Sequence, residues 1–268
     1  ALTMNVIAES FPNASALMIV LSVIVISILF GVVYAALLAV ACVNFNGDQT
    51  IVGTALNILG TAAATVIVKA INTAANPDNV SSVVKYIQPK KAFLFHVGGM
   101  ELNWFMVVTV IALICAYVTL YKTKFGLRLM ACGEHPQAAD SVGVNVYRMR
   151  YAGVAISGAL AGVGGLVFVV PTSTNFNATV AGYGFLALAV LIFGQWRPSR
   201  ILFAAFFFGL MKTVASAYSG IPFLANLGIP NDVYKMVPYV ATLIVLAFTS
   251  KNSMAPRAEG IPYDKGSR

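Results

Sequence analysis

Long apolar runs without charged residues alternate with short polar segments along this chain. The first run, residues 10–47, contains no charged side chain. Because a helix needs about 20 mainly apolar residues to cross the hydrocarbon core of a bilayer, such runs predict membrane-spanning helices. Seven are expected, over residues 16–43, 51–68, 104–120, 151–170, 178–196, 201–218 and 234–248.

The composition agrees with a membrane location. Of the 268 residues, 59% are hydrophobic and 10% are charged, whereas a soluble domain has roughly 25% charged residues. The surface of this chain therefore cannot be covered with polar groups and faces lipid. The sequence predicts an all-α, polytopic integral membrane protein, with a single transmembrane domain over residues 1–268 and one broken or re-entrant segment.

Basic residues predict the orientation, since Lys and Arg favour the cytoplasmic side of a membrane. Placing loop 121–150 in the cytoplasm, with strict alternation, puts eleven Lys and Arg residues inside and five outside, and makes 250–268 a cytoplasmic tail. The loop 69–103, with four lysines, is the weakest part of this assignment because it then lies outside. Loop lysines and arginines near lipid phosphates account for the net charge of +8, so no nucleic-acid partner is expected.

The fourth run has a face with little side-chain bulk. Gly158 and Gly162 form a GxxxG motif, and small residues allow helix backbones to approach closely within a membrane. Further small residues recur every four positions at Gly153, Ser157, Ala161 and Gly165. We expect another helix to pack against these residues.

The fifth run is interrupted by glycine. Gly182 and Gly184 leave an uninterrupted apolar part, residues 185–193, that is too short to cross a bilayer. Irregular backbone at membrane depth is tolerated only beside protein or a water-filled cavity. The run therefore predicts a broken or re-entrant segment in the translocation path. The alternative is a surface loop and then a helix that starts at Phe185 and continues through the polar turn at Gly194.

The candidates for the substrate path include aromatic side chains, whose flat faces can stack on a base or sugar ring. They also include two polar residues within the predicted spans. Lys212 is the one charge inside a predicted span, and it either snorkels to the outer headgroups or faces an internal cavity. Asn57 either joins two helices by a hydrogen bond or meets a polar cargo. The full set is Asn57, Asn175, Phe176, Tyr183, Phe185 and Lys212.

Acidic residues are absent from the predicted spans. All nine Asp and Glu residues fall in loops or tails, whereas proton- and sodium-coupled carriers usually keep ionisable groups within their spans. An energy source outside the chain is therefore favoured, although sodium sites built from backbone carbonyls would escape this test.

No motif of an enzyme, a nucleotide site or a metal site occurs in the sequence. HExxH, GxSxG and the P-loop GxxxxGK[ST] are all missing. Neither His96 nor His135 has a metal ligand at helical spacing. The cysteines, Cys42, Cys115 and Cys132, lack the spacing of a disulfide or zinc framework. We expect neither catalysis nor a bound cofactor or metal.

The most specific segment covers residues 124–167, KFGLRLMACGEHPQAADSVGVNVYRMRYAGVAISGALAGVGGLV. It resembles the loop and following helix shared by membrane permeases of ABC importers for simple sugars, nucleosides and branched-chain amino acids. In that family a Gly-Glu-Asn-Pro stretch precedes paired alanines, Gly-Val or Gly-Ile, a basic cluster and a small-residue helix. The matching positions are Gly133, Glu134, His135, Pro136, Ala138, Ala139, Gly143 and Val144, with His135 in place of the usual Asn.

Other segments extend the resemblance over most of the chain. Gly-Thr-Ala-Leu-Asn at residues 53–57 and the tail APRAEGIPYDKGSR at residues 255–268 are similar to the nucleoside branch, and AGYGFLALAVLIFG at residues 181–194 adds to the match. The segment with which nucleoside-type permeases usually open is missing. The resemblance therefore implies a ten-helix core whose first helices precede Ala1.

The resemblance implies the permease subunit of an ATP-driven importer in the bacterial cytoplasmic (inner) membrane. Such a subunit forms the path for nucleosides delivered by an external binding protein or lipoprotein. Its implied partners are a second permease subunit of a different chain and an ABC ATPase. The same role for simple sugars or branched-chain amino acids is an alternative, and an ion-coupled secondary carrier is a weaker one.

The loop 121–150 has the features of a coupling element. A permease without a nucleotide site must receive the force of ATP binding through a rigid, exposed cytoplasmic helix. Pro136 in the first turn and Gly143 as a stop predict such a helix from Glu134 to Val142, and Glu134 suits its positive end. The residues expected to couple to the ATPase are Gly133, Glu134, His135, Pro136, Ala138, Ala139, Ser141 and Gly143.

Overall fold

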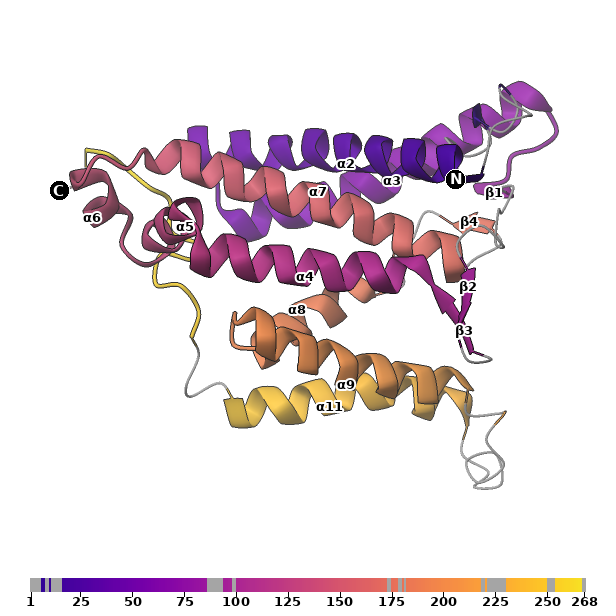
Figure 1. Ribbon diagram of the computed structural model, residues 1–268. Coiled ribbons are helices and arrows are strands. Elements are labelled where there is room, and N and C mark those ends of the chain that lie inside the picture. Colours follow the sequence, from indigo (N-terminus) through magenta and orange to yellow (C-terminus); the bar gives the residue numbers. More distant parts are fainter. Residues whose placement is uncertain are drawn as a thin grey trace. The chain divides into compact units, whose positions relative to one another are not determined.

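The computed structural model describes residues 6–7, 10, 16–85, 94–97, 100–172, 175–177, 180, 182–217, 220, 230–249 and 254–266. This part of the chain is mostly helical (Figure 1). It divides into two compact units, and each is described by itself. Unit 1 consists of Ala1–Ala112, Lys122–Thr179 and Arg257–Arg268, and unit 2 consists of Leu113–Tyr121 and Val180–Pro256.

Three long helices form the body of unit 1. Helix α2 (Ala16–Ala39) continues into a π-helical turn, η1 (Val40–Asn44), and is followed by α3 (Gln49–Ala75) and, later in the chain, α7 (Val146–Thr172). Helix α3 begins where the Asp48 carboxylate accepts hydrogen bonds from the backbone N–H groups of Thr50 and Ile51, at 2.8 and 2.9 Å. This side-chain cap satisfies two donors that a helix start otherwise leaves unpaired.

Helices α2 and α7 touch backbone to backbone. A Cβ atom added to Gly158 or Gly162 of α7 would overlap the backbone carbonyl of Gly31 or Ser27 in α2, and a Cβ added to Gly31 would overlap the Gly158 carbonyl. Only residues without a side chain permit this approach. Near the far end of the same helix pair, Val23 and Leu166 are buried together with Phe105 at the start of α4 (Trp104–Lys122).

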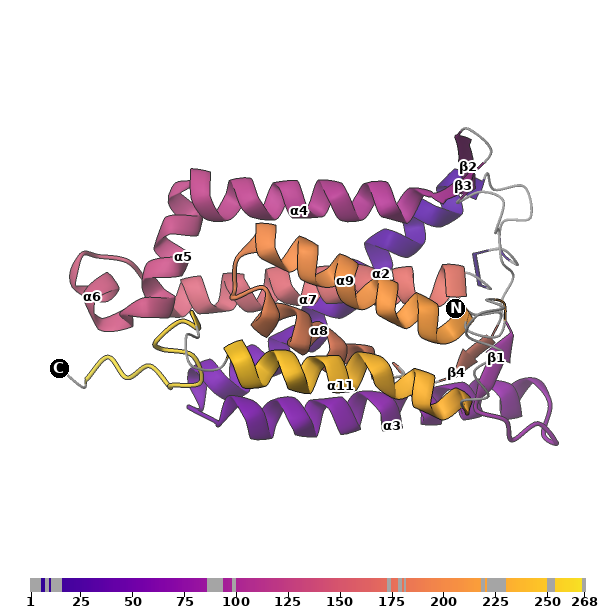
Figure 2. The ribbon, with the colours of Figure 1, turned by 90° about the horizontal axis from the view of Figure 1, so that it is seen from below.

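The two ends of unit 1 differ. One end carries two short helices, α5 (Lys124–Glu134) and α6 (Pro136–Ser141), together with residues 257–266 of the tail (Figure 1). At the opposite end β1 (Val83–Lys85) pairs antiparallel with β4 (Asn175–Asn177) (Figure 2). A second antiparallel pair, β2 (Leu94–Val97) and β3 (Met100–Asn103), leads into α4.

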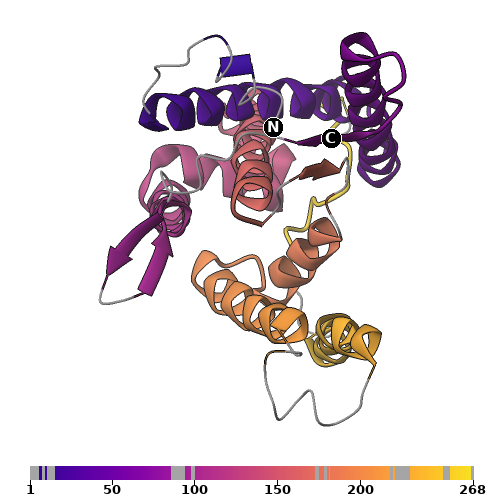
Figure 3. The same ribbon diagram turned by 90° about the vertical axis from the view of Figure 1, so that its right-hand side faces the viewer.

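Unit 2 is built from three mutually packed helices and part of α4. Helices α8 (Tyr183–Phe193), α9 (Pro198–Ala217) and α11 (Asn231–Thr249) form one group (Figure 3). Phe193 of α8 packs against Phe207 and Phe208 of α9, with ring centroids 6.1 and 5.9 Å away. Phe208 is 1% exposed and lies at the centre of this contact.

The polar turn between α8 and α9 stops α8. Gln195 and Trp196 have positive φ angles of 52° and 54°, a region that residues with side chains seldom adopt. The Gln195 side chain is 6% exposed, and its Oε1 accepts a 2.9 Å hydrogen bond from the backbone N–H of Met254. The alternative of a helix running on through Gly194 is therefore wrong, and α8 has only 11 residues.

The helical membrane class is confirmed, but the predicted count of seven crossings is not. Within the described residues five helices are long and apolar enough to span a bilayer, namely Met18–Asn44, Gln49–Ala75, Trp104–Lys122, Val146–Val169 and Pro198–Ala217. Helix α8 is too short, as expected, and α11 opens with the polar residues Asn231, Asp232 and Lys235. None of the five spans contains Asp or Glu.

The extent of α3 and the presence of short strands within the described residues differ from the prediction. The span expected over residues 51–68 continues as α3 to Ala75, because a single lysine, Lys69, does not interrupt a helix. The all-α prediction also missed four short strands. They lie between helices, where backbone pairing over three or four residues leaves little periodicity in the sequence.

We predict that Gly158→Ala lowers the thermal midpoint of the permease in detergent, because the new methyl group would overlap the Gly31 carbonyl. Overpacking costs about 1–3 kcal/mol, which exceeds the roughly 1 kcal/mol that alanine gains over glycine in helix propensity. Gly165→Ala is the matched control, since a Cβ there meets no atom within 4 Å. Equal midpoints for the two variants would contradict the contact.

Candidate functional site

Helix α6 is set by proline and glycine signals at its two ends. Pro136 is its first residue, a position where the missing N–H is not needed. After Ser141 the chain turns at Gly143, whose φ of +86° favours glycine. The turn is closed by two backbone hydrogen bonds, from Gly143 to Asp140 at 2.9 Å and from Val144 to Ala139 at 3.0 Å.

The short helix is narrower than the predicted range from Glu134 to Val142. Glu134 is the last residue of α5, and Val142 lies just beyond the end of α6. The predicted start at Glu134 is wrong because His135, with φ −142°, separates two helices at that point. Helix α5 itself was not predicted, since only six apolar side chains, few for a span, are spread through its eleven residues.

Helix α6 has an inner and an outer face. Ala139, only 5% exposed, points inward and shares a buried cluster with Cys132 of α5 and Val146 of α7. Burial raises the pKa of the Cys132 thiol, which therefore stays neutral and packs as an apolar group. The outer face of α6 consists of the exposed residues Gln137, Ala138 and Ser141, together with the exposed Val142 just beyond the end of the helix.

Tail residues complete the inner cluster, which the sequence did not predict. Tyr263 is 3% exposed and buried with Cys132, Ala139 and Val146. Its ring meets that of Tyr147 edge to face, with centroids 5.3 Å apart. The only signal in the sequence was one aromatic residue within a polar tail. Such a residue does not reveal that it packs against Ala139, which lies more than a hundred residues earlier in the chain.

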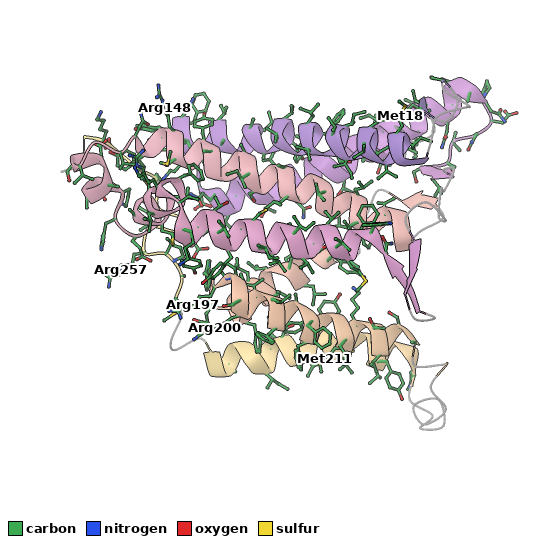
Figure 4. All side chains as sticks on the ribbon, in the orientation of Figure 1. Met18, Arg148, Arg197, Arg200, Met211 and Arg257 are labelled. Carbon is green, nitrogen blue, oxygen red and sulfur yellow. The ribbon has the colours of Figure 1, made fainter. Side chains whose placement is uncertain are left out.

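Two hydrogen bonds, one from the backbone and one from a side chain, hold the tail residues that precede Tyr263. The N–H of Ala258 donates to the carbonyl of Gly133 at 2.9 Å. The guanidinium of Arg150 donates to the carbonyl of Ile261 at 3.1 Å. These bonds join the tail to the end of α5 and to the start of α7. Arg148 and Arg257 project outward at this end of unit 1 (Figure 4).

The structure brings two of the predicted path residues together. In unit 2 the ammonium of Lys212 on α9 lies 3.7 Å from the ring centroid of Tyr183, the first residue of α8. This is the geometry of a cation–π contact. Phe185, two residues further along α8, is 74% exposed. Lys212 thus has an aromatic neighbour within the described residues.

The other path candidates lie in unit 1 and do not form a cluster there. Asn57 is exposed on α3. Asn175 and Phe176 belong to β4, where their backbones pair with Lys85 and Val84 of β1.

The small residues of α7 fall into two sets. Gly158 and Gly162 lie against α2, and a Cβ at Gly153 would approach Leu129 of α5 to 3.2 Å. The remaining three make no close approach within the described part of unit 1: Ser157 and Ala161 are exposed, and Gly165 faces open space.

Metal-binding groups do not gather anywhere in the described residues. No set of three or more His, Cys, Asp or Glu side chains there is placed to hold a metal ion.

Comparison with known proteins decides the family. Residues 1–246 match the family described as "Branched-chain amino acid transport system / permease component". The chain belongs to this permease family. This membership confirms the predicted multi-pass permease of the cytoplasmic membrane and the expectation that it is not an enzyme. A permease component works with other components of its transport system.

Named relatives cover most of the permease. It is 37% identical over 243 residues to the guanosine ABC transporter permease protein NupQ of Bacillus subtilis (strain 168), covering 89% of this chain and 76% of the relative. It is 38% identical over 250 residues to the nucleoside ABC transporter permease protein NupC of Lactococcus lactis subsp. cremoris (strain MG1363), covering 90% and 78%. The putative glucose ABC transporter permease protein TsgC13 of Haloferax volcanii is 26% identical, covering 83% and 73%. No solved structure matches the chain.

We predict that Lys212 and Tyr183 stabilise each other. In a double-mutant cycle of Lys212→Met and Tyr183→Leu, measured by thermal unfolding in detergent, the coupling energy should be about 0.5–2 kcal/mol. Tyr183→Phe should retain most of it, since the ring remains. The matched control pairs Lys212→Met with Phe185→Leu, which should be additive because Phe185 is exposed. Additivity in the first cycle would contradict the contact.

Proposed function

We propose that this permease forms the translocation path of an ATP-driven nucleoside importer. The observation that carries the proposal is α6, a short helix whose inner face is fixed in a buried cluster and whose outer face is exposed. The sequence contains no nucleotide site of its own, so ATP binding must act through contact with another subunit. A rigid helix at the end of the spanning bundle is suited to that contact.

The outer face of α6 has the composition of a docking surface. Val142, just beyond the end of α6, is 79% exposed, and Ala138, four residues before it, is exposed together with the polar residues Gln137 and Ser141. An apolar centre with a polar rim is typical of protein interfaces. We therefore assign this face to the ATPase. The other coupling candidates, Gly133, Glu134, His135, Pro136, Ala139 and Gly143, then shape and support the helix.

Nucleosides are the proposed cargo because two relatives at 37% and 38% identity are named for guanosine and nucleoside transport. Within unit 2 the ammonium of Lys212 lies over the Tyr183 ring, and Tyr183 is 39% exposed, so the pair offers a cation and an exposed aromatic side chain to a flat ring with polar substituents. Asn57, Asn175, Phe176 and Phe185 are the other residues that we propose for contact with the cargo. Simple sugars, for which another relative is named, and branched-chain amino acids are the alternatives.

The proposed assembly contains four kinds of component. These are this permease, a second permease subunit of a different chain, an ABC ATPase and an external substrate-binding protein or lipoprotein. We propose a ten-helix core for the complete permease, with residues 1–268 in one transmembrane domain, 121–150 as the coupling loop and 250–268 as the cytoplasmic tail. An ion-coupled carrier is disfavoured because the five candidate spans contain no acidic residue.

We predict that Ala138→Arg abolishes uptake and co-purification of the ATPase while the permease remains inserted. The substitution places a long cation at the centre of the exposed face without entering the buried cluster. The measurement is the amount of ATPase retained with affinity-tagged permease, together with uptake into cells. Asp78→Arg, in the exposed turn after α3 at the other end of unit 1, is the control and should behave as wild type.

Ala139→Arg distinguishes contact from collapse. Because Ala139 is buried, arginine there should lower the thermal midpoint of the permease itself, which Ala138→Arg should not do. Normal ATPase retention in Ala138→Arg would contradict the assignment of the outer face of α6 to the ATPase.

The cargo is tested by competition. Uptake of labelled guanosine should be inhibited by other nucleosides, and at least about tenfold more weakly by ribose, glucose or leucine, a preference equal to about 1.4 kcal/mol. The control is a strain lacking the ATPase, in which uptake should disappear. If glucose or leucine competed more strongly than nucleosides, the cargo would be a sugar or an amino acid instead of a nucleoside.

A further inference from the structure

The cytoplasmic tail is the part of the described chain to which the proposed function assigns no role. Residues 257–264 nevertheless contact all three elements of the coupling end. Ala258 bonds to Gly133 at the end of α5, Ile261 accepts from Arg150 in α7, and Tyr263 covers Ala139 of α6. A terminal segment that merely follows the last helix has no need of three such contacts.

The tail folds into a shape that delivers Tyr263 to the cluster. Ile261 donates its backbone N–H to the carbonyl of Ala258 at 3.3 Å, and Gly260 between them has a φ of +76°. This tight turn reverses the chain, and Pro262 then restricts the backbone just before Tyr263. Residues on either side of the buried ring, Pro262 and Asp264, are exposed. The tail therefore inserts one side chain into unit 1.

The buried ring contacts residues from three helices. Its neighbours Cys132, Ala139 and Val146 come from α5, α6 and α7. The guanidinium of Arg150 lies 5.8 Å from the ring centroid, on a further side. Burial, together with the carboxylate of Asp140 beside Ala139 on α6, raises the pKa of Tyr263, so the hydroxyl stays protonated.

We propose that Tyr263 is a positioning residue for energy coupling, through which the tail clamps α6 to the start of α7. With the clamp in place, a displacement of α6 moves α7, and α7 moves α2 through the glycine contact at Gly158. Without it, α6 swings on its flanking residues and the displacement is lost in the loop. The inference rests on the proposed function, since the ATPase is taken to push on the outer face of α6.

Tyr263→Ala in the full-length, assembled complex tests the clamp. ATPase retention should be unchanged, because the outer face of α6 is untouched, while the number of nucleosides imported per ATP hydrolysed should fall about tenfold, within the range of coupling between distant sites. Tyr263→Phe keeps the ring and should restore most of the ratio. Lys265→Ala, an exposed residue of the same tail, is the matched control. A wild-type ratio in Tyr263→Ala would overturn the positioning role.

Trypsin provides a readout that does not depend on the cargo. The peptide bond after Arg257 is protected when the tail is docked, because the Ala258 N–H is bonded to Gly133, whereas the bond after Lys265 lies beyond the clamp. In detergent-solubilised complex, Tyr263→Ala should speed cleavage after Arg257 about tenfold by opening the docked state and leave cleavage after Lys265 unchanged.

Each outcome of the digestion decides one claim. Rapid cleavage after Arg257 in the wild-type complex would show an undocked tail and overturn the clamp. Protection in the wild type, lost in Tyr263→Ala and kept in Tyr263→Phe, would support it. Protection together with an absence of nucleoside uptake in the wild type would reject the proposed cargo while leaving the docked tail established.

Discussion

The contact on which unit 1 depends is the approach of two helix backbones where neither has a side chain. Gly31 of α2 and Gly158 of α7 meet at a separation that no Cβ atom would permit. Within a bilayer the hydrophobic effect does not drive helices together. Close packing such as this supplies the attraction between them. Since α7 begins at the end of unit 1 that carries α5 and α6, its attachment to α2 also gives these short helices a fixed base.

Close packing against a small side chain also holds the end of unit 1 that carries α5 and α6. Helix α6 has six residues, too few for a stable isolated helix, so its structure must come from neighbours. Ala139 supplies a small surface that α5, α7 and Tyr263 enclose. The exposed side of α6 is then held in a fixed orientation, as the proposed contact with an ATPase would require.

Local sequence signals predicted much of the fold. Contacts between residues far apart in the chain could not be predicted in this way. Apolar runs located the five spans because length and composition alone set them, and Pro136 and Gly143 bracketed α6 because both act on the backbone at their own positions. The sequence also contained the GxxxG motif of α7, but not the identity of its partner helix. Neither the contact of Lys212 with Tyr183 nor the docking of Tyr263 leaves a periodic pattern, and the inward direction of Ala139 depends on neighbours that are distant in the chain.

The position of the docked tail in the chain has a consequence for biogenesis. The ribosome makes residues 257–264 after every helix that the structure describes, so the spans enter the membrane while the pocket around Ala139 is still empty. The cluster around Ala139 is completed only when residues 257–264 emerge and fold back onto α5, α6 and α7. A chain that lacks these residues would therefore contain the described helices without the ring that encloses Ala139.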